Sequence, residues 1–483
     1  MTKLTKLALL LISASLLLLF GIIVNRGERS ARHFVILSTN DIHAQIDNFA
    51  SLASAIEACR DTTNVILVDA GDRWTGNAFV DLVEHYTPIY TMFNYLGYDV
   101  TIYGNHEFDK GQAYVAEANR QAKFPIIGAN IVSDTTSFPQ PLSHYIVDVE
   151  GKKIAFVGIV GNYDGDNHPS GKSESYQGLR FLDPHTTAAQ YGSLRQKCDM
   201  LVLVSHCGLE RDVEFAQSEL SGGYDHIISG HSHDTADQVE NGILISQTGS
   251  RLENIGATMV TIKADGEVIL THRNIPLKEY EPKAEVLEMV EEYHNNPHLN
   301  EPIGSAAQEF SHMALKNLFA ESIRKRSNSA IGVYHQGGVR VKQLDAGSIS
   351  MATVLNAEPF NSYIATATMS VGQLRDLVMA KFNDTRNVGE AHCIDLVMTT
   401  PYTILVDDSG DAVDVIFHEL DTTKSYKVAM GDYIFKTYKG LSYTNGKISE
   451  TLITTTLEEY IKANNPLRPN EKSLQEIKTQ GAE

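Results

Sequence analysis

Cysteine is scarce in this chain, and the few that occur lie far apart. Cys59, Cys198, Cys207 and Cys393 contain no Cys-x-x-Cys pair, so one disulfide is open in an oxidising compartment but the spacing selects no partners. Cys207 directly follows His206 and is expected to face away from it and pack in the core. No cysteine precedes Cys59, so a lipid anchor on an N-terminal cysteine is not expected.

Positive charge is in deficit as well. The 40 lysines and arginines face 60 aspartates and glutamates, which gives a formal net charge of −20. The surface field therefore repels polyanions, and a nucleic-acid partner is not expected. If the substrate carries phosphate, metal ions and a few local arginines must supply the positive charge that the chain as a whole lacks.

An uncharged apolar stretch occurs near the start of the chain. Residues 7–24 follow Lys3 and Lys6, a pattern typical of an export signal, although a signal core usually has ~7–15 residues and a membrane span ~20. No clear small-x-small cleavage site precedes Arg26, and basic residues flank both ends. We expect residues 1–32 to direct export to the periplasm, the cell surface or the medium, as a cleaved signal or a retained membrane anchor. A buried core helix is the alternative.

Strand and helix patterns alternate over residues 33–275. Short apolar runs predict strands, and longer amphipathic runs between them predict helices. This order indicates a layered α/β fold with much parallel pairing, in which ligands collect at the carboxyl ends of the strands. The expected strands are 34–39, 64–68, 99–103, 153–160, 201–205 and 226–229, with closing strands within 242–263. The expected helices are 48–59, 81–96, 115–121, 186–197 and 211–219, and residues 163–178 are expected to form a loop.

The chain divides after this region. Asp265-Gly266 predicts a hairpin turn, and a charged helical stretch over residues 283–294 is bracketed by prolines. We therefore place a linker helix at residues 276–300 and a smaller α/β domain at residues 301–483. Its expected helices are 314–326, 351–355 and 371–381, and its expected strands are 330–334, 363–369, 402–406, 413–417 and 426–429. The last dozen residues are expected to fray.

Residues 103–109 carry the first chemical signal. They follow a predicted strand, and Gly104 allows a sharp turn where the strand ends. Asn105 then offers a neutral oxygen to a cation, His106 offers a proton donor, and Asp109 is near enough to orient that donor. Alone, the motif is more typical of a turn that carries a solvated histidine.

Four other predicted strands in the same half of the chain also end in metal-binding side chains. They lead to Asp41 and His43, to Asp72, to His206, and to His231 and His233. In an extended segment, residues two apart share one side, so each of the two closely spaced pairs is expected to face one way. Each ligand has a structural alternative, such as a capping carboxylate or a satisfied core histidine, but five such strand ends favour one metal site.

This donor set suits two divalent cations. A pair of ions about 3.5–4 Å apart activates water, orients a phosphate and stabilises the attacking and leaving oxygens. Nitrogen and oxygen ligands without cysteine favour Zn, Mn, Co or Fe. We expect Asp72 to bridge the two ions, because a carboxylate has two oxygens to share. The other ligands are expected to be Asp41, His43 and His233 for one ion, and Asn105, His206 and His231 for the second.

The same residues, in the same order, resemble the motif set of the calcineurin-like metallophosphoesterases. The matching motifs are Asp41-x-His43, Gly71-Asp72, Gly104-Asn105-His106-Glu107, His206 after an apolar strand, and Gly230-His231-x-His233. The longer string through Phe108-Asp109-x-Gly111 is similar to the 5′-nucleotidase branch, which includes UDP-sugar hydrolases and 2′,3′-cyclic phosphodiesterases. The resemblance covers residues 34 to about 470.

The resemblance implies both a fold and a reaction. The fold is α/β, with a layered metallophosphoesterase sandwich domain at residues 33–275 and a 5′-nucleotidase-type domain after the linker. In the implied reaction a metal-bound hydroxide attacks phosphorus. His106, oriented by Asp109 and adjacent to Asn105, stabilises the transition state or protonates the leaving oxygen.

The second half resembles the substrate domain of that family less closely. Gly337, Gly338 and Arg340 remain of an Asn-x-Gly-Gly-x-Arg motif. Phe360 and Tyr433 stand where two aromatic rings hold a nucleobase. The resemblance therefore implies that Arg340, Phe360 and Tyr433 bind substrate. From the residues alone, the glycines beside the arginine favour binding over a pairing with a surface acid, whereas the rings could equally be core.

Other recognition positions depart from the family pattern. His335 replaces the asparagine of the glycine motif, and Ser311 stands where an arginine is expected ahead of the first helix. The usual Gly-Gly-Asp-Gly after the second aromatic reads Thr437-Tyr438-Lys439-Gly440. Lys439 or His335 could serve a different polar group of the substrate.

Together these observations predict an exported dimetal phosphoesterase that acts on small phosphoesters, above all 5′-nucleotides. A 2′,3′-cyclic phosphodiesterase, a nucleoside-diphosphate-sugar hydrolase and a non-catalytic surface binding protein that keeps the metal site are the alternatives. The preferred phosphoester, the metal and the oligomeric state stay open at this stage.

Overall fold

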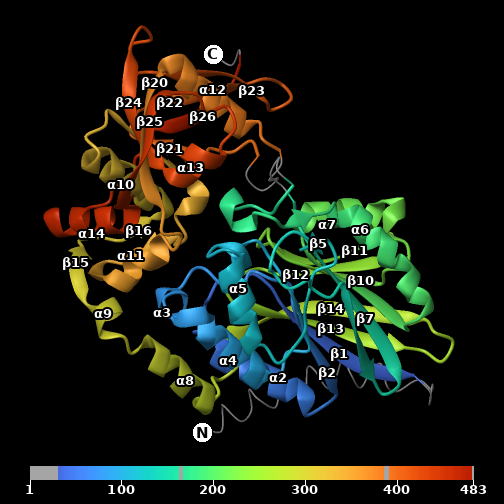
Figure 1. Ribbon diagram of the computed structural model, residues 1–483. Helices are drawn as coiled ribbons and strands as arrows, with labels where there is room; N and C mark the ends of the chain where they lie inside the picture. Colours follow the sequence, from blue (N-terminus) through green and yellow to red (C-terminus); the bar gives the residue numbers. More distant parts are fainter. Residues whose placement is uncertain (1–30, 163–166, 386–390, 481–483) are drawn as a thin grey trace.

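Two α/β domains lie side by side in the computed structural model, which describes residues 31–162, 167–385 and 391–480 (Figure 1). The stretch 7–24, which we expect to direct export, lies outside the described residues, as does part of the loop expected at 163–178. In the described part of the chain, no helix has the length and apolar character needed to cross a membrane.

The N-terminal domain is built on two six-stranded sheets. Its strands are β1 (Arg32–Thr39), β2 (Asn64–Asp69), β3 (Val100–Ile102), β4 (Ile126–Ile127), β6 (His144–Val149), β7 (Lys152–Val160), β9 (Met200–His206), β10 (His226–Ser229), β11 (Thr235–Glu240), β12 (Ile243–Thr248), β13 (Asn254–Ile262) and β14 (Val268–Pro276). One sheet has the order β14-β13-β1-β2-β3-β4, and the other has the order β11-β12-β10-β9-β7-β6. The runs β1 to β4 and β12-β10-β9-β7 are parallel, so their carboxyl ends share an edge.

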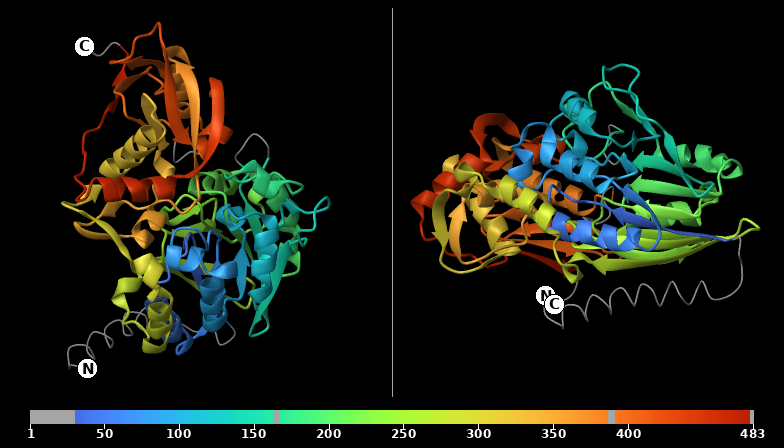
Figure 2. Two further views of the ribbon diagram at one scale, coloured as in Figure 1. Left: turned by 60° about the vertical axis from the view of Figure 1, so that its left-hand side comes forward. Right: turned by 90° about the horizontal axis from the view of Figure 1, so that it is seen from below.

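Helices cover the outer faces of both sheets, which gives four layers (Figure 2). The covering helices are α2 (Phe49–Arg60), α4 (Thr87–Leu96) and α8 (Ala284–His294) on the first sheet, and α6 (Pro184–Tyr191) and α7 (Leu209–Gln217) on the second. Between the sheets, Phe34 and Val68 pack with Phe156 and Val202. Because each central strand is buried on both faces, its sequence is a continuous apolar run.

The C-terminal domain has a five-stranded and a three-stranded sheet. Its main elements are α10 (His312–Arg326), β17 (Ile331–His335), α11 (Met351–Ala357), β20 (Tyr363–Ser370), α12 (Val371–Phe382), β21 (Leu396–Met398), β22 (Tyr402–Val406), β23 (Ala412–Phe417), β24 (Ser425–Gly431), α13 (Asp432–Thr437), β25 (Thr444–Leu452), α14 (Ile453–Ala463) and β26 (Gln475–Thr479). The sheet orders are β21-β17-β24-β20-β25 and β23-β22-β26. Helices α10 and α14 cover one face of the larger sheet, and α12 packs with the smaller sheet on the other face.

Two of the expected helix and coil assignments are wrong. The helix expected over 81–96 is interrupted, because His85 and Tyr86 have φ angles of 54° and 51°, and α4 begins only at Thr87. Pro88 lacks the N–H that a continuous helix would need, so it starts a helix rather than extending one. The chain end expected to fray instead forms β26, which pairs in parallel with β22.

The domains contact each other through two short helices, one from each domain. Ala78 and Phe79 of α3 (Ala78–Asp81) pack with Ala352 of α11. The Asn356 side-chain oxygen accepts the Ala78 N–H at 2.7 Å. The C-terminal domain is thereby held over the carboxyl ends of the N-terminal strands.

Candidate dimetal active site

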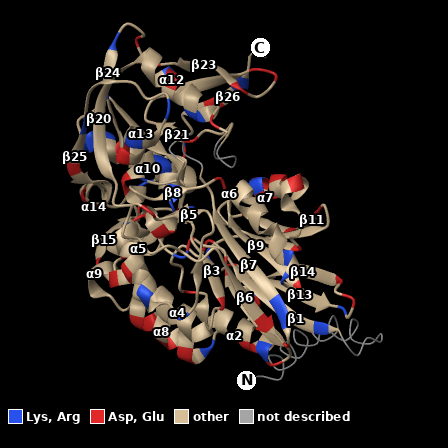
Figure 3. Ribbon diagram, turned by 45° about the vertical axis from the view of Figure 1, so that its right-hand side comes forward, with Lys and Arg blue, Asp and Glu red and all other residues tan. Residues whose placement is uncertain are grey.

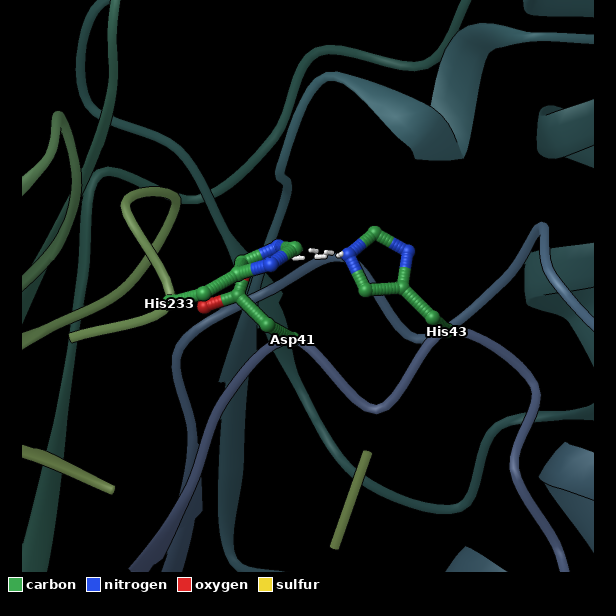
Figure 4. Close-up of side chains that lie close together, drawn as sticks. All are labelled: Asp41, His43 and His233. Atoms are coloured by element: carbon green, nitrogen blue, oxygen red, sulfur yellow. Dashed lines mark hydrogen bonds and ion pairs between the residues drawn. The ribbon is translucent and has the colours of Figure 1, made fainter. Parts of the chain in front are cut away.

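The first group of ligands joins the loop after β1 to the loop after β10. The Nε2 atoms of His43 and His233 lie 2.9 Å apart, and Asp41 Oδ1 lies 3.5 Å from His233 Nε2 (Figure 4). The three side chains point toward one another from segments far apart in the sequence (Figure 4). Their ligand atoms are close enough to hold one cation.

The second group comes from four strand ends. His206 Nε2 lies 3.1 Å from Asp72 Oδ2, and His231 Nδ1 lies 3.0 Å from Asn105 Oδ1. Ligand atoms of Asp72, His206 and His231 all lie within 4.8 Å of one another. The structure therefore brings all the residues predicted as metal ligands to one place.

Asp72 lies between the two groups. Its carboxylate is within 4.8 Å of ligand atoms of His43 and His106 as well as those of His206 and His231. This central position supports Asp72 as the bridging ligand. The division of the ligands between two ions stays a prediction.

The loops that carry the ligands are not extended, contrary to the expectation from residue spacing. Positive φ angles occur at Asp41 (49°), His43 (50°), Asp72 (55°), His231 (83°) and His233 (61°). Such backbone conformations cost a non-glycine residue of order 1–3 kcal/mol and persist where the surroundings impose them. The paired ligands converge because the backbone turns between them, and not because they share one side of a strand.

Hydrogen bonds between neighbouring loops hold these conformations. The Asp41 N–H donates to the Gly71 carbonyl at 3.0 Å, and the His43 N–H donates to the Asp72 carbonyl at 2.9 Å. A Cβ atom on Gly104 would lie 2.1 Å from Asp72 Oδ1. Glycine is therefore required at this position for the loops after β2 and β3 to approach so closely.

Two histidines of the cluster present one ring nitrogen to the cation position. His43 Nδ1 lies 3.1 Å from the Thr75 carbonyl, and His206 Nδ1 lies 2.7 Å from the Ala70 carbonyl. A carbonyl can only accept, so these nitrogens carry the hydrogen and leave each Nε2 lone pair to a metal ion. The buried Nε2 atom of His206 instead faces the Asp72 carboxylate at 3.1 Å, inside the ligand cluster. The site therefore fits divalent cations.

The acids and imidazoles of the cluster shift one another's pKa. Burial raises the pKa of Asp72, but His206 and His106 outweigh this effect and hold it well below its usual range. Burial lowers the pKa of His206, but Asp72 and Asp41 raise it to about 10. Burial and the charge of His206 lower the pKa of His231 to about 3. Cation binding by His206 would therefore release a proton.

His106 lies beside the cluster and is held by Asp109. The His106 Nδ1–H donates to Asp109 Oδ2 at 2.8 Å, and the Thr75 hydroxyl donates to the same oxygen at 2.7 Å. The His106 backbone N–H donates to Asp72 Oδ1 at 2.9 Å. Burial lowers the pKa of His106, but Asp109 and Asp72 raise it above its ordinary value. The ring is thus fixed with Nε2 toward the ligand cluster.

A cleft of about 540 Å³ opens above the ligands and is lined by both domains. The C-terminal domain contributes Arg340, whose Nη2 lies 3.2 Å from both ring nitrogens of His43. It also contributes Phe360, whose ring stacks on His106 with centroids 5.8 Å apart, and Tyr433. The predicted substrate residues therefore line the same cleft as the predicted metal ligands.

Both parts of the chain match known families. Residues 34–235 match the family described as calcineurin-like phosphoesterase, and residues 297–445 match the 5′-nucleotidase, C-terminal domain. The chain is a calcineurin-like phosphoesterase with a 5′-nucleotidase C-terminal domain. The family and the layered α/β fold implied by the motifs are thus confirmed.

Individual relatives are distant but cover most of the chain. The trifunctional nucleotide phosphoesterase protein YfkN of Bacillus subtilis is 26% identical over an alignment of 474 positions, which covers 83% of this chain and 31% of YfkN. The 5′-nucleotidase of Vibrio cholerae is 23% identical over an alignment of 472 positions, which covers 84% of each chain. The structure of a 5′-nucleotidase precursor from Thermus thermophilus superimposes with a TM-score of 0.79 at 18% identity, covering 92% of this chain and 99% of the other. The chain thus spans about a third of YfkN.

In the 5′-nucleotidase C-terminal domain, a serine that caps a helix stands where an arginine was expected. Ser311 begins α10, where its hydroxyl accepts the Ala314 N–H at 3.2 Å, and it does not line the cleft. His335 stacks on Tyr433 with centroids 5.1 Å apart, and it lines the cleft together with Lys439. The cleft of this phosphoesterase therefore holds Arg340 without the second arginine that the family pattern led us to expect.

Two buried charged residues of the phosphoesterase domain were not assigned a role from the sequence. The Glu107 carboxylate accepts the backbone N–H groups of Asp72 at 3.0 Å, Arg73 at 2.8 Å and Gly104 at 2.5 Å. The fully buried Arg73 donates to the Ile102 carbonyl at 2.6 Å, and its Nη2 lies 3.6 Å from Glu107. Glu107 therefore links the loops that carry Asp72 and Asn105. Its place inside the strand-end motif was the only sequence signal.

Proposed function

We propose that this protein releases phosphate from 5′-nucleotides and related small phosphoesters, in a reaction that requires two divalent cations. One observation carries the proposal. The nitrogen and oxygen donors of five strand ends converge beside His106, under a cleft that presents Arg340 and two aromatic rings. Cations at this position would polarise phosphoryl oxygens and lower the pKa of a bound water molecule. The donors favour Zn, Mn, Co or Fe.

His106 is the proposed catalytic side chain. Because Asp109 accepts the Nδ1–H, the Nε2 atom faces the cluster, where it lies 4.0 Å from Asp72 Oδ2. From there His106 can donate a hydrogen bond to a phosphoryl oxygen or a proton to the leaving oxygen. Asp109 keeps the ring in this orientation, and Asn105 presents its side-chain oxygen to a cation beside it.

The substrate phosphate is proposed to lie between the ligand cluster and Arg340. The guanidinium already reaches His43 from the opposite domain, so an anion placed there meets positive charge from two sides. A nucleobase would then contact Phe360 and Tyr433 farther along the cleft. The net charge of −20 disfavours anions over the surface as a whole, and the outer helices α7 and α8 carry several acidic side chains (Figure 3).

Export is a further part of the proposal. It is supported by the uncharged stretch 7–24 behind Lys3 and Lys6. Fractionation of the producing cells would place the activity outside the cytoplasm, and activity confined to the cytoplasmic fraction contradicts export. Whether residues 7–24 are retained as an anchor follows from the mass of the mature chain.

The function is tested with the full chain and added Mn²⁺ or Zn²⁺. Phosphate release is measured from AMP, UDP-glucose, 2′,3′-cyclic AMP and p-nitrophenyl phosphate, with Asp72→Ala as the control that lacks the bridging carboxylate. We expect release from AMP and from the aryl phosphate, and none with the variant. Release from the aryl phosphate alone would remove the nucleotidase assignment and keep the metal chemistry. Release from no substrate would favour a binding protein.

A further inference from the structure

Arg251, in a turn of the N-terminal domain, contacts Arg340 of the C-terminal domain. Arg251 follows β12, has a φ angle of 56°, and is only half-buried. Its guanidinium donates a hydrogen bond to the backbone carbonyl of Arg340. Arg251 does not line the cleft, so it does not itself meet a bound substrate.

The turn that carries Arg251 is fixed to the metal-ligand loops. The Arg251 backbone N–H donates to the Asp41 carbonyl at 2.8 Å. The next residue, Leu252, is 2% exposed in the core, and its carbonyl accepts a hydrogen bond from the Asn48 side chain at 2.9 Å. The guanidinium of Arg251 therefore projects from a base that is rigid relative to the ligand cluster.

On the other side, Arg340 lies in a short segment after β17. Its backbone N–H donates to the Ala357 carbonyl at 3.0 Å, at the end of α11. Its carbonyl receives Arg251, and its side chain turns toward His43. The Arg340 side chain extends over the ligand cluster from this backbone segment. The contact with Arg251 thus connects the segment to the loop that holds Asp41.

The pairing of Arg251 with Arg340 places two positive charges close together. Because this is electrostatically unfavourable, its presence indicates a function. Burial and the charge of Arg340 lower the pKa of Arg251, and Glu253 partly opposes this effect. A simple tether between domains would be more stable with a neutral donor. A second cation near Arg340 instead favours an anion in the adjacent cleft. Such a contribution fits a chain in which Ser311 stands where another arginine was expected.

We propose that Arg251 is a positioning residue for Arg340, and that it sets the affinity of the site for the phosphate group of a phosphomonoester. The Arg251 guanidinium holds the Arg340 backbone in register with the metal-ligand loops, so that the Arg340 guanidinium meets the phosphate. The inference rests on the proposed function, in which Arg340 binds substrate phosphate.

The test measures inhibition by inorganic phosphate and the kinetics of p-nitrophenyl phosphate hydrolysis by the full chain with Mn²⁺. The variants are Arg251→Ala, Arg340→Ala and the double variant. Arg251→Lys keeps a donor of similar reach. Arg60→Ala is the matched control, because Arg60 also donates to backbone carbonyls, those of Leu96 and Gly97, within the N-terminal domain.

We expect Arg251→Ala to raise the inhibition constant of phosphate and KM about tenfold, as for the loss of one hydrogen bond with a charged donor. We expect kcat and Mn²⁺ affinity to change little. Arg251→Lys should stay within about threefold of the wild type, since it retains the donor. Arg60→Ala should lower only the melting temperature. The double variant should be no worse than Arg340→Ala, because Arg251 acts through Arg340.

The outcomes separate the two claims. If the effects of Arg251→Ala and Arg340→Ala multiply in the double variant, or if Arg251→Ala leaves the inhibition constant unchanged while Arg340→Ala raises it, the positioning role is wrong. If Arg340→Ala itself changes neither the inhibition constant of phosphate nor KM, the proposed phosphate site is wrong, and so is this inference. Should Arg251→Ala not fold, Arg251→Gln is used, because its side chain is polar but two bonds too short to reach the carbonyl.

Discussion

Replacement of Glu107 by glutamine tests how the ligand loops are held in place. Glu107 is 1% exposed, and its carboxylate accepts three backbone N–H groups, from Asp72, Arg73 and Gly104. Glutamine has the same size, but one oxygen becomes an NH₂ group, which donates and cannot accept. At least one of the three backbone donors must then face another donor.

The least costly arrangement keeps the amide oxygen on Asp72 and Gly104 and turns the NH₂ group toward Arg73. One buried N–H is then unsatisfied, which costs about 1–3 kcal/mol. Arg73 also loses an acidic partner, and breaking a buried ion pair costs about 3–5 kcal/mol. Since Asp69 stays 3.4 Å from Arg73, we expect each loss near its lower bound, which gives a total of about 4 kcal/mol of unfolding free energy. We expect the affinity for Mn²⁺ to fall about 10- to 100-fold, as for other residues that orient metal ligands.

Calorimetric titration of the full chain with Mn²⁺ measures the affinity, and denaturant unfolding measures the stability. Asp225→Asn is the matched control, because Asp225 accepts the Leu201 N–H at 2.8 Å at the amino end of β9, away from the ligands. The control should lose stability and keep its affinity for Mn²⁺. Equal affinity losses in both variants, or an unchanged affinity in Glu107→Gln, would refute the reasoning.

Four more outcomes are expected. His106→Ala should lower kcat by ~10²–10⁴ while Mn²⁺ affinity is kept, and an unchanged rate contradicts its catalytic role. Phe360→Ala should raise KM for AMP about tenfold, since one aromatic contact is worth roughly 1–1.5 kcal/mol. The KM for p-nitrophenyl phosphate should change little. Equal losses on both substrates would identify the ring as structural. Removal of metal by a chelator should abolish activity and lower the melting temperature, and Mn²⁺ should restore both; activity that survives chelation contradicts the metal requirement. Burial raises the pKa of Glu358 from 4.5 to about 7. The folded chain therefore binds the extra proton, and the unfolding free energy should fall as pH rises from about 4.5 to about 7, by up to about 3 kcal/mol, in the wild type but not in Glu358→Gln; parallel pH curves would contradict this.

Most of the strands could be predicted because burial on both faces leaves a strong local signal. The strands β1, β2, β9 and β10 each contain a continuous apolar run, at 34–37, 65–68, 200–204 and 227–228, and a metal-binding side chain follows each run. The break before α4 could not be read from apolar periodicity, since the residues on both sides of His85 continue a helical pattern. The strand β26 was missed because its sequence is polar and its pairing partner β22 lies far away in the chain.

The candidate site, too, could be predicted only in part from the sequence. Donor residues could be predicted from their types and their places after strands. Their backbone conformations could not, because positive φ at Asp41 and His43 is held by backbone hydrogen bonds to the distant loop after β2. The contact of Arg251 with Arg340 joins residues 89 positions apart in different domains, and no local pattern encodes it. Roles that depend on such contacts become visible only once the chain is folded.

Under the proposed function, the placement of Arg340 would explain how a protein with a net charge of −20 binds an anion. The metal ligands belong to the N-terminal domain, while the guanidinium that approaches His43 belongs to the C-terminal domain. In the proposed complex, phosphate would therefore be bound from both sides only while the domains keep this arrangement. A nucleobase, in contrast, would meet Tyr433 within the C-terminal domain alone. Substitutions at the domain contact, such as those at Arg251, should consequently weaken every phosphoester alike, whereas substitutions at the aromatic rings should discriminate between nucleotides and simpler esters.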